Sequence, residues 1–460
     1  MILKKLAFLI FLLSFPAGFS QPLSLKDAVD KGVANYGTIR AKSKYKAAAD
    51  ETVKQTKREY LPNLSVSAQQ DYGTVNGQNG PLYGFGGLGV ASSGLPLPEQ
   101  NWNAGFGALY LANVNWDFFT FGKMKQRINL SKADAERYQK DLEQETFQHK
   151  VRISAAYLNL LASQRLLISQ QKNLERSMIF QRLAAVRVKN GLLAGVDSTL
   201  ASAEVSRAKI ALNQIKDQVK DQNNKLVALM GVPIQDFILD SAFVKQIPKS
   251  ILKLNTNDSI NPILEFYKSR VDFGKQQLKL FKRDYYPNFS LFGVYQTRGS
   301  GFNSDYASNQ NSFTQNYFDG VDPVRQNYLV GLGVTWNLTT ILRTSKKVSA
   351  QKLVADGLQD EYNVVDQQLK TQSDAADAKI KFAIDNYVEA PKQVDAAKQA
   401  YLQRTTLYKN GLTNLTDVTQ AFYTLNRAEI DRDIIYANVW QSLLLKAAAT
   451  GDFDTFINEF

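Results

Sequence analysis

Two stretches of this chain alternate between apolar and polar positions, as β-strands with two unlike faces do. In residues 102–118, aromatic and aliphatic side chains take the even positions, while Asn, Gly and Asp take most of the odd ones. Residues 327–338 repeat the pattern, with one face made of Tyr328, Val330, Leu332, Val334, Trp336 and Leu338. Two shorter strands are predicted at residues 62–72 and 287–297, which gives four strands per chain.

Long helices follow the strands. Residues 123–189 contain neither Pro nor Gly, and a helix of that length would extend about 100 Å. The returning stretch, residues 196–230, carries apolar residues at alternating spacings of three and four, broken only at Gln222. This spacing is typical of coiled coils, and a single helix cannot bury such a seam alone.

The whole pattern occurs twice. Residues 60–66 read Tyr-Leu-Pro-Asn-Leu-Ser-Val and residues 285–291 read Tyr-Tyr-Pro-Asn-Phe-Ser-Leu, while Lys-Asn-Gly-Leu occurs at both 189–192 and 409–412. We interpret the chain as a tandem duplication. The predicted organisation begins with a first repeat at 21–231, whose helical hairpin has its tip at 190–197. A linker or equatorial segment with little structure follows at 232–260. The second repeat is at 261–451, with a hairpin tip at 410–417, and a tail follows at 452–460. Each repeat is expected to begin with a helix, at 25–59 and 261–284, and to join its strands by an exposed polar loop, at 73–101 and 298–326.

The N-terminus has the order of a secretory signal. Lys4 and Lys5 precede an apolar run that ends before Pro16, and small residues follow. A short membrane anchor is the alternative, but the run is too short to span a bilayer. We expect residues 1–20 to be cleaved and the protein to be exported.

Export and strand length together favour strands with one face in lipid, over a soluble antiparallel sheet with one buried face. Four strands cannot close a transmembrane barrel, because every strand edge must be paired within lipid. The chain is therefore expected to form a homo-oligomer, and three copies would supply twelve strands.

Composition excludes several kinds of chemistry. The chain has no Cys and a single His, His149, so thiolate sites, zinc sites with several His ligands and a Cys nucleophile are ruled out. The net charge of +12 is spread along helices with acidic residues between, which argues against a nucleic-acid partner. The glycine-rich stretch 84–89 lacks the strand–helix context of a nucleotide-binding loop. We expect no catalytic residues, no metal and no cofactor, and a protein that is not an enzyme.

With this duplicated plan, the Tyr-x-Pro-Asn motifs and the two Asn-Gly-Leu turns, the mature chain resembles the TolC family of outer-membrane channels. The resemblance implies an α+β membrane protein: a homotrimer with a twelve-strand outer-membrane β-barrel continued by a long periplasmic α-helical barrel of coiled coils. It also implies an outer-membrane location with a large periplasmic portion and contact with outer-membrane lipid. The implied function is the exit duct of a tripartite efflux pump, together with a periplasmic adaptor protein and an inner-membrane transporter. The channel of a type I protein secretion system is one alternative, and a secreted coiled-coil interaction or adhesion protein is another.

The resemblance also implies a gate at the periplasmic helix tips. Asp417 matches the first of two carboxylates that ring the family's entrance, and Gln420 stands at the second position. Because Asp417 and Asp197 lie early in predicted helices, each is equally explained by a favourable interaction with the helix dipole. Tyr408 and Asp197 match a Tyr–Asp link that holds the family entrance shut, whereas Thr413 replaces the Arg of a second link. Coiled-coil packing is the other interpretation of Tyr408.

Turn and junction residues complete the predicted sites. The turn positions Gly191, Leu192, Gly411 and Leu412 are expected to dock the adaptor, although turn geometry alone also explains the glycines. Pro62 and Pro287 precede strands, where a missing N–H is tolerated, and are expected to shape the junction of the two barrels.

Overall fold

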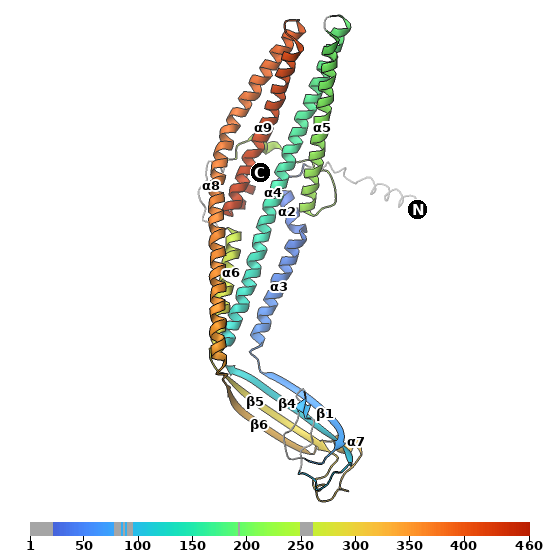
Figure 1. Ribbon diagram of the computed structural model, residues 1–460, viewed down its shortest axis with the longest axis vertical. Helices are drawn as coiled ribbons and strands as arrows, with labels where there is room; N and C mark the ends of the chain where they lie inside the picture. Colours follow the sequence, from blue (N-terminus) through green and yellow to red (C-terminus); the bar gives the residue numbers. More distant parts are fainter. Residues whose placement is uncertain (1–21, 78–83, 86–87, 90–94, 192–193, 249–260) are drawn as a thin grey trace, which may run out of the picture. The chain divides into compact units, whose positions relative to one another are not determined.

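A computed structural model describes residues 22–77, 84–85, 88–89, 95–191, 194–248 and 261–460. The predicted signal peptide lies outside these residues. The chain divides into two compact units (Figure 1). A helical unit comprises the residues up to Ala48, Glu136–Val271 and Gly357–Phe460, and a sheet unit comprises Ala49–Ala135 and Asp272–Asp356.

The sheet unit is built on four antiparallel strands in the order β1, β4, β5, β6. Their bounds are β1 Asn63–Thr74, β4 Ala104–Phe119, β5 Asn288–Ser300 and β6 Arg325–Thr335. The two-residue strands β2 (Gly84–Phe85) and β3 (Leu88–Gly89) pair separately. The central β4–β5 ladder joins the two repeats, and its register shifts between Trp116 and Phe119. The last strand ends at Thr335 rather than at the predicted residue 338. Leu338 lies in the turn that leads into the following helix.

The register divides the sheet into two unlike faces. Paired residues point to the same side, so the even positions of β4 share a face with their partners on both neighbours. We call this the apolar face; it contains Leu64, Val66, Tyr72, Phe106, Tyr110, Val114, Leu291, Tyr295, Tyr328, Val330, Leu332 and Val334. Most of these side chains on the two outer strands are more than half exposed, from Tyr72 at 57% to Tyr328 at 83%. The opposite face carries Asn, Ser, Gln and Asp among its residues.

The duplication is visible where the strands begin. Pro62 immediately precedes β1 and Pro287 immediately precedes β5. In the first repeat the indole N–H of Trp116 donates to the carbonyl of Tyr60 at 2.8 Å, and in the second Trp336 donates to Tyr285 at 3.2 Å. The Tyr-x-Pro-Asn motif therefore fixes a backbone acceptor for the same indole in both repeats.

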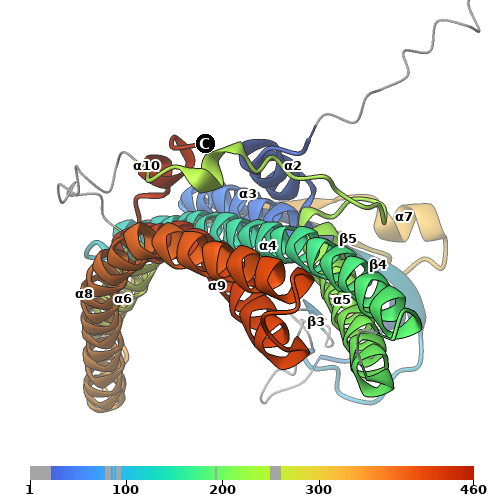
Figure 2. The same cartoon turned by 90° about the horizontal axis from the view of Figure 1, so that it is seen from above.

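Two very long helices and two shorter partners form the hairpins. They are α4 (Lys123–Lys189) with α5 (Gly195–Met230), and α8 (Thr340–Lys409) with α9 (Leu415–Thr450). The lead-in helices are α2 (Leu25–Asn35) and α3 (Gly37–Arg58) in the first repeat, and α6 (Pro262–Phe281) with the short 3-10 helix η3 (Lys282–Tyr285) in the second. The single helix predicted for 25–59 is interrupted at Tyr36, whose backbone is extended. Within the helical unit, α4 lies between α5 and α9 (Figure 2).

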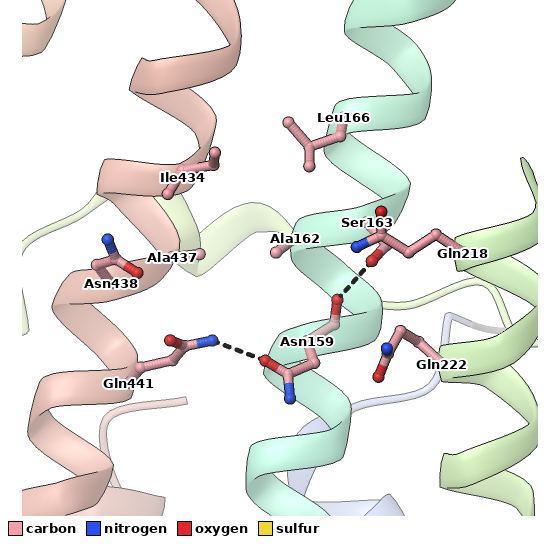
Figure 3. Close-up of a pocket in the computed structure, with 10 residues that line it drawn as sticks. All are labelled: Asn159, Ala162, Ser163, Leu166, Gln218, Gln222, Ile434, Ala437, Asn438 and Gln441. Atoms are coloured by element: carbon pink, nitrogen blue, oxygen red, sulfur yellow. Dashed lines mark hydrogen bonds between the residues drawn. The ribbon is translucent and has the colours of Figure 1, made fainter. Parts of the chain in front are cut away.

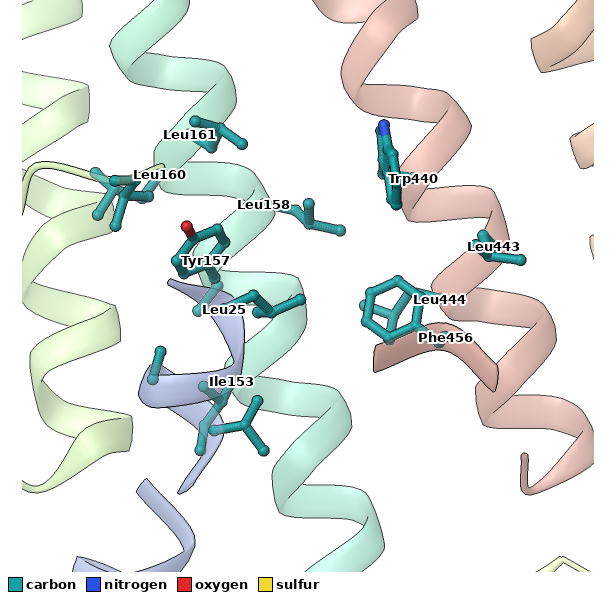
Figure 4. Packing of buried hydrophobic residues seen from close by; sticks show 14 of the residues in the cluster. Leu25, Ile153, Tyr157, Leu158, Leu160, Leu161, Trp440, Leu443, Leu444 and Phe456 are labelled. Carbon is teal, nitrogen blue, oxygen red and sulfur yellow. The ribbon is translucent and has the colours of Figure 1, made fainter. Parts of the chain in front are cut away.

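The hydrophobic core gathers side chains from α2, α4, α9 and the C-terminal helix α10 (Phe453–Ile457) (Figure 4). Trp440, Tyr157 and Phe456 are its largest fully buried side chains. The Tyr157 hydroxyl donates to the carbonyl of Leu23 at 2.7 Å, and burial raises its pKa well above the usual range. The same cluster includes Leu226 and Met230 of α5 and Ile380 and Ala383 of α8, so it holds six helices together.

The described part of the predicted linker, residues 232–248, has little regular structure and is held against the helical bundle. Leu239 forms a parallel bridge with Leu23, and the short 3-10 helix η1 (Ala242–Lys245) follows. The Asn223 amide of α5 donates to the carbonyl of Gln235 at 2.7 Å, so side chains of the bundle satisfy the linker's backbone.

The polar loop of the second repeat is partly buried, although it was predicted to be exposed. It contains the helix α7 (Tyr317–Val321), and Tyr306 within it is 4% exposed. Gly320 of α7 packs so tightly that an added Cβ would lie 2.6 Å from the Cβ of Phe106 in β4. This part of the loop is thus packed on the sheet and is not an exposed connection.

Candidate functional site

The turns at the hairpin tips depend on glycine. Gly191 has a φ of +72° and Gly411 a φ of +77°, in the left-handed region that other residues adopt only with strain. Open space surrounds both Cα atoms, so the backbone angle and not crowding requires glycine. Leu412 is 73% exposed at its tip, and Leu192 lies outside the described residues.

Arg187 joins the two tips. It lies in the last turn of α4, and its guanidinium donates to the carbonyl of Tyr408 and, at 2.8 Å, to the carbonyl of Lys409. These carbonyls belong to the last turn of α8 and have no acceptor role within that helix. A positive charge also interacts favourably with the negative end of a helix. One arginine therefore caps the second hairpin from the first.

Tyr408 is fully buried between the hairpins. Its ring packs against Phe180 of α4, with ring centroids 5.5 Å apart, and lies 5.2 Å below the Arg187 guanidinium carbon. Burial, reinforced by the Asp197 carboxylate, raises the pKa of the hydroxyl. That hydroxyl has no hydrogen-bond partner among the described residues. The predicted link between Tyr408 and Asp197 is therefore not formed as a hydrogen bond in this structure, and it stays a prediction.

Asp417 lies in the first turn of α9, as predicted. Its backbone N–H donates to the side chain of the N-cap residue Asn414 at 2.9 Å. Its carboxylate accepts a 2.5 Å hydrogen bond from the Thr413 hydroxyl and lies 3.5 Å from the Arg404 guanidinium. Thr413, in place of the family's Arg, thus binds Asp417 itself, and Gln420 lies exposed one turn further along. This geometry supports the helix-dipole interpretation of Asp417 and leaves its place in a pore ring a prediction.

A second link joins the two returning helices. The Tyr423 hydroxyl of α9 donates to the Glu204 carboxylate of α5 and accepts from the Arg207 guanidinium at 2.6 Å. Burial and the Glu204 carboxylate raise the pKa of Tyr423. The phenol therefore stays protonated and can act as donor and acceptor at once.

Two further links lie deeper in the bundle, both between α4 and α9. Arg176 forms a bidentate pair with Glu429. Asp433, only 2% exposed, accepts from the Ser169 hydroxyl at 2.7 Å and from Arg165 at 3.3 Å. We call the contacts centred on Arg187, Tyr423, Arg176 and Asp433 the hairpin-bridging links.

A cavity of about 360 Å³ lies between α4, α5 and α9 (Figure 3). Its walls carry amide side chains and no charge; they are Asn159, Ala162, Ser163, Leu166, Gln218, Gln222, Ile434, Ala437, Asn438 and Gln441. The amide of Gln441 donates to Asn159 at 2.8 Å across it. On α4 these positions lie opposite Tyr157 and Gln164, which contact residues 232–248.

The residues that join the hairpins were largely missed by reasoning from sequence. Arg187 was not predicted, because the family's Arg was sought near the second turn, where Thr413 stands. Glu204 and Tyr423 also went unnoticed, although a Tyr and a Glu at wet positions of a coiled coil are a usable signal. Among the described residues, no group of His, Asp or Glu could hold a metal ion. None of the helices in the described ranges has both the length and the apolar character needed to cross a membrane.

Comparison with known proteins shows that part of the chain matches a protein family. Residues 30–232 match the family described as outer membrane efflux protein. The match covers most of the first repeat, and the second repeat continues the same fold. No curated protein matches the sequence significantly.

Solved structures share the fold along nearly the whole chain. An outer-membrane protein of Vibrio cholerae, VceC, aligns over 93% of this chain and 96% of its own, with 16% identity and a TM-score of 0.72. The Campylobacter jejuni outer-membrane channel CmeC aligns over 95% and 90%, with 16% identity and a TM-score of 0.72. The Neisseria gonorrhoeae outer-membrane channel MtrE, solved in an open state, aligns over 93% and 88%, with 14% identity and a TM-score of 0.71.

The family match and the shared fold confirm the predicted resemblance and fold class: four strands per chain and a long helical part. They also confirm the predicted location in the outer membrane. The family is one of channels and not of enzymes.

Proposed function

We propose that this chain forms a homotrimeric outer-membrane channel, the exit duct of a tripartite efflux pump. The observation that carries the proposal is a sheet with two open edges and one exposed apolar face. Among the described residues, β1 pairs only with β4, and β6 pairs only with β5. Unpaired backbone groups are not tolerated in lipid, so the edges of neighbouring copies must pair with each other. Three copies close a barrel of twelve strands.

The assembly is tested by the mass of the detergent-extracted protein. We expect three chains per particle after the detergent contribution is subtracted, with no monomer that withstands dilution. Protein that remains monomeric and dissolved without detergent would contradict the barrel and favour a periplasmic coiled-coil protein.

We propose further that the hairpin-bridging links hold the duct closed at its helix tips. Each link joins a helix of the first hairpin to a helix of the second, so separating the hairpins must break them. Hydrogen bonds to charged groups contribute about 2 kcal/mol each, and the four links together resist separation without preventing it. Asp417, Tyr408, Asp197, Thr413 and Gln420 remain the candidate gate residues at the same tips.

Conductance tests this gate. Arg207→Ala removes a guanidinium that binds Tyr423 on the other hairpin, and we expect a higher single-channel conductance in a planar bilayer. Arg427 is the matched control, because it occupies the corresponding position of the second repeat and is largely exposed. Its ion pair among the described residues is with Asp431, one turn along its own helix, at 3.7 Å. Equal conductance of both variants and the wild type would contradict the gate.

The same tips are the proposed docking site for partner proteins. We propose that a periplasmic adaptor docks at Gly191, Leu192, Gly411 and Leu412, and that the adaptor connects the duct to an inner-membrane transporter. Leu412 is an exposed apolar side chain at a helix end, the kind of contact that a helical partner buries. Leu412→Asp should abolish cross-linking to the adaptor and restore drug sensitivity to the cell. Loss of secreted protein with unchanged drug sensitivity would instead favour a secretion channel.

A further inference from the structure

The short helix α7 lies on the apolar face of the sheet. Its Tyr317 ring packs edge-on against Phe106, with centroids 5.2 Å apart, and Phe106 contacts Tyr72 of β1 at 4.7 Å. Phe106 and Tyr72 are directly paired residues on the apolar face. This end of the sheet is formed by the ends of β1 and β5 and the beginnings of β4 and β6, opposite the end marked by Pro62 and Pro287.

Glycines allow the close approach of α7 to the sheet. An added Cβ at Gly320 would lie 2.6 Å from Phe106 Cβ, and one at Gly299 would lie 2.7 Å from the carbonyl oxygen of Asp322. Neither gap admits a side chain. The helix is therefore seated directly on the backbone of β4 and β5.

A chain of hydrogen bonds fixes α7 in place. The Tyr317 hydroxyl donates to the Gln70 side-chain oxygen at 2.8 Å, and the Gln70 amide donates to the Tyr110 hydroxyl at 3.2 Å. The Tyr110 hydroxyl in turn donates to the carbonyl of Val321 at 3.2 Å. The chain pairs polar groups that would otherwise be unsatisfied on an apolar face, which allows that face to enter a low-dielectric medium.

One large side chain of α7 takes no part in this packing. Phe318 is 76% exposed, and its ring contacts the neighbouring Tyr317 at 5.4 Å between centroids. The next residue, Asp319, is exposed and acidic. Aromatic rings beside charged groups are typical of segments at a membrane surface, whereas a helix deep in hydrocarbon carries no exposed carboxylate.

We propose that α7 is an interfacial anchor, which inserts Phe318 into the lipid of the outer leaflet where the apolar face of the sheet meets water. The occupant is lipid because the surface continues the apolar face, which an outer-membrane strand turns toward the bilayer. The proposal rests on the proposed barrel. It adds a lipid contact made by a loop helix, in addition to those of the strands.

The absence of Cys from the chain makes site-specific fluorescent labelling a direct test. Phe318→Cys, Tyr328→Cys and Leu329→Cys are each labelled with an environment-sensitive fluorophore and reconstituted into liposomes that contain spin-labelled lipids. Tyr328 lies on the apolar face and is 83% exposed, whereas the adjacent Leu329 lies on the opposite face and is 59% exposed. All three positions are exposed, so labelling does not require the protein to open.

We expect strong quenching at Phe318 and Tyr328 and several-fold weaker quenching at Leu329. The Phe318 label should respond most to a spin label near the lipid headgroup, and the Tyr328 label to one deeper in the acyl chain. Quenching at Tyr328 without quenching at Phe318 would overturn the anchor and leave the barrel intact. Equal, weak quenching at all three positions would overturn both the anchor and the barrel. Gly320→Val in the Phe318→Cys background should reduce quenching, because it displaces α7 from Phe106.

Discussion

Arg187 caps the helix that carries Tyr408, although the two residues belong to different repeats. The guanidinium binds the carbonyls of Tyr408 and Lys409 and lies over the Tyr408 ring at 5.2 Å. A single side chain thus satisfies a helix end, covers a buried aromatic ring and joins two hairpins. The joint is local to the tips, where we propose the gate.

Arg187→Ala should loosen this joint. The two α8 carbonyls lose a charged donor, and the loss of such a bond costs about 2 kcal/mol. We expect faster amide hydrogen exchange in residues 404–412 and a higher single-channel conductance. Arg187→Lys should give exchange rates and a conductance between those of the wild type and Arg187→Ala, because an ammonium group does not reproduce the fork of a guanidinium. Unchanged exchange in this segment, measured beside Arg427→Ala as control, would refute the role of Arg187.

Tyr408→Phe tests whether the buried hydroxyl finds a partner in the assembly. If it binds Asp197 in the closed trimer, as we predict, Tyr408→Phe and Asp197→Asn should each raise conductance. The double variant should then match the single ones, because both remove the same bond. A Tyr408→Phe protein with unchanged conductance and a higher melting temperature would show that the hydroxyl is unpaired in the trimer as well.

The sequence predicts contacts that repeat with a period and does not predict those that depend on one pair of distant residues. Strand alternation around Tyr110 and Val330 identifies the apolar face, since the period of two survives any detail of packing. The cap that Arg187 makes is different, because its acceptors are backbone carbonyls 221 and 222 residues away, which leave no mark in the sequence. The link from Tyr423 to Glu204 joins two side chains that are 219 residues apart, so the sequence shows both residue types but not that they meet.

His149 gives the helical unit a pH dependence. Its ring is fully buried and stacks on Tyr36 with centroids 3.7 Å apart; burial, with the nearby Arg152, lowers its pKa below the usual value of about 6.5. The unfolded chain therefore binds a proton before the folded one does. This contribution to stability is present above about pH 6.5 and is lost as the pH falls toward the folded-state pKa.

His149→Phe keeps a ring against Tyr36 and removes the titration. We expect the melting temperature of the wild type in detergent to fall more steeply between pH 7.5 and 5.5 than that of His149→Phe. Carboxylates titrate mostly below this range and affect both proteins alike. Parallel melting curves over this interval would show that His149 is not the group responsible.

Replacing a tip glycine by alanine should destabilise the protein, whereas the same replacement inside a helix should stabilise it. Gly411→Ala forces a residue with a Cβ into a φ of +77° and should destabilise the tip by about 1 kcal/mol. Gly357→Ala, within α8 and with open space around it, should stabilise by up to about 1 kcal/mol. Thermal unfolding measures the stability change of each variant. Stabilisation by Gly411→Ala would contradict the turn geometry.

Loop composition was the least reliable guide to structure. Residues 298–326 are rich in Gly, Asn and Ser, a composition typical of exposed connections. Yet Gly299 and Gly320 allow close backbone contacts that a side chain would block. Asn316 caps α7, because its side chain accepts from the Phe318 N–H at 2.9 Å. The same residue types serve exposed turns and close packing, and only the three-dimensional neighbours distinguish the two uses.

Single-channel recording of the mature wild type beside Arg187→Ala decides whether this protein is a gated outer-membrane duct. We expect small conductance steps for the wild type and clearly larger steps for Arg187→Ala in the same bilayer. The gated duct would be contradicted by purified, membrane-inserted protein that gives no conductance in either form, or by two proteins with identical large steps.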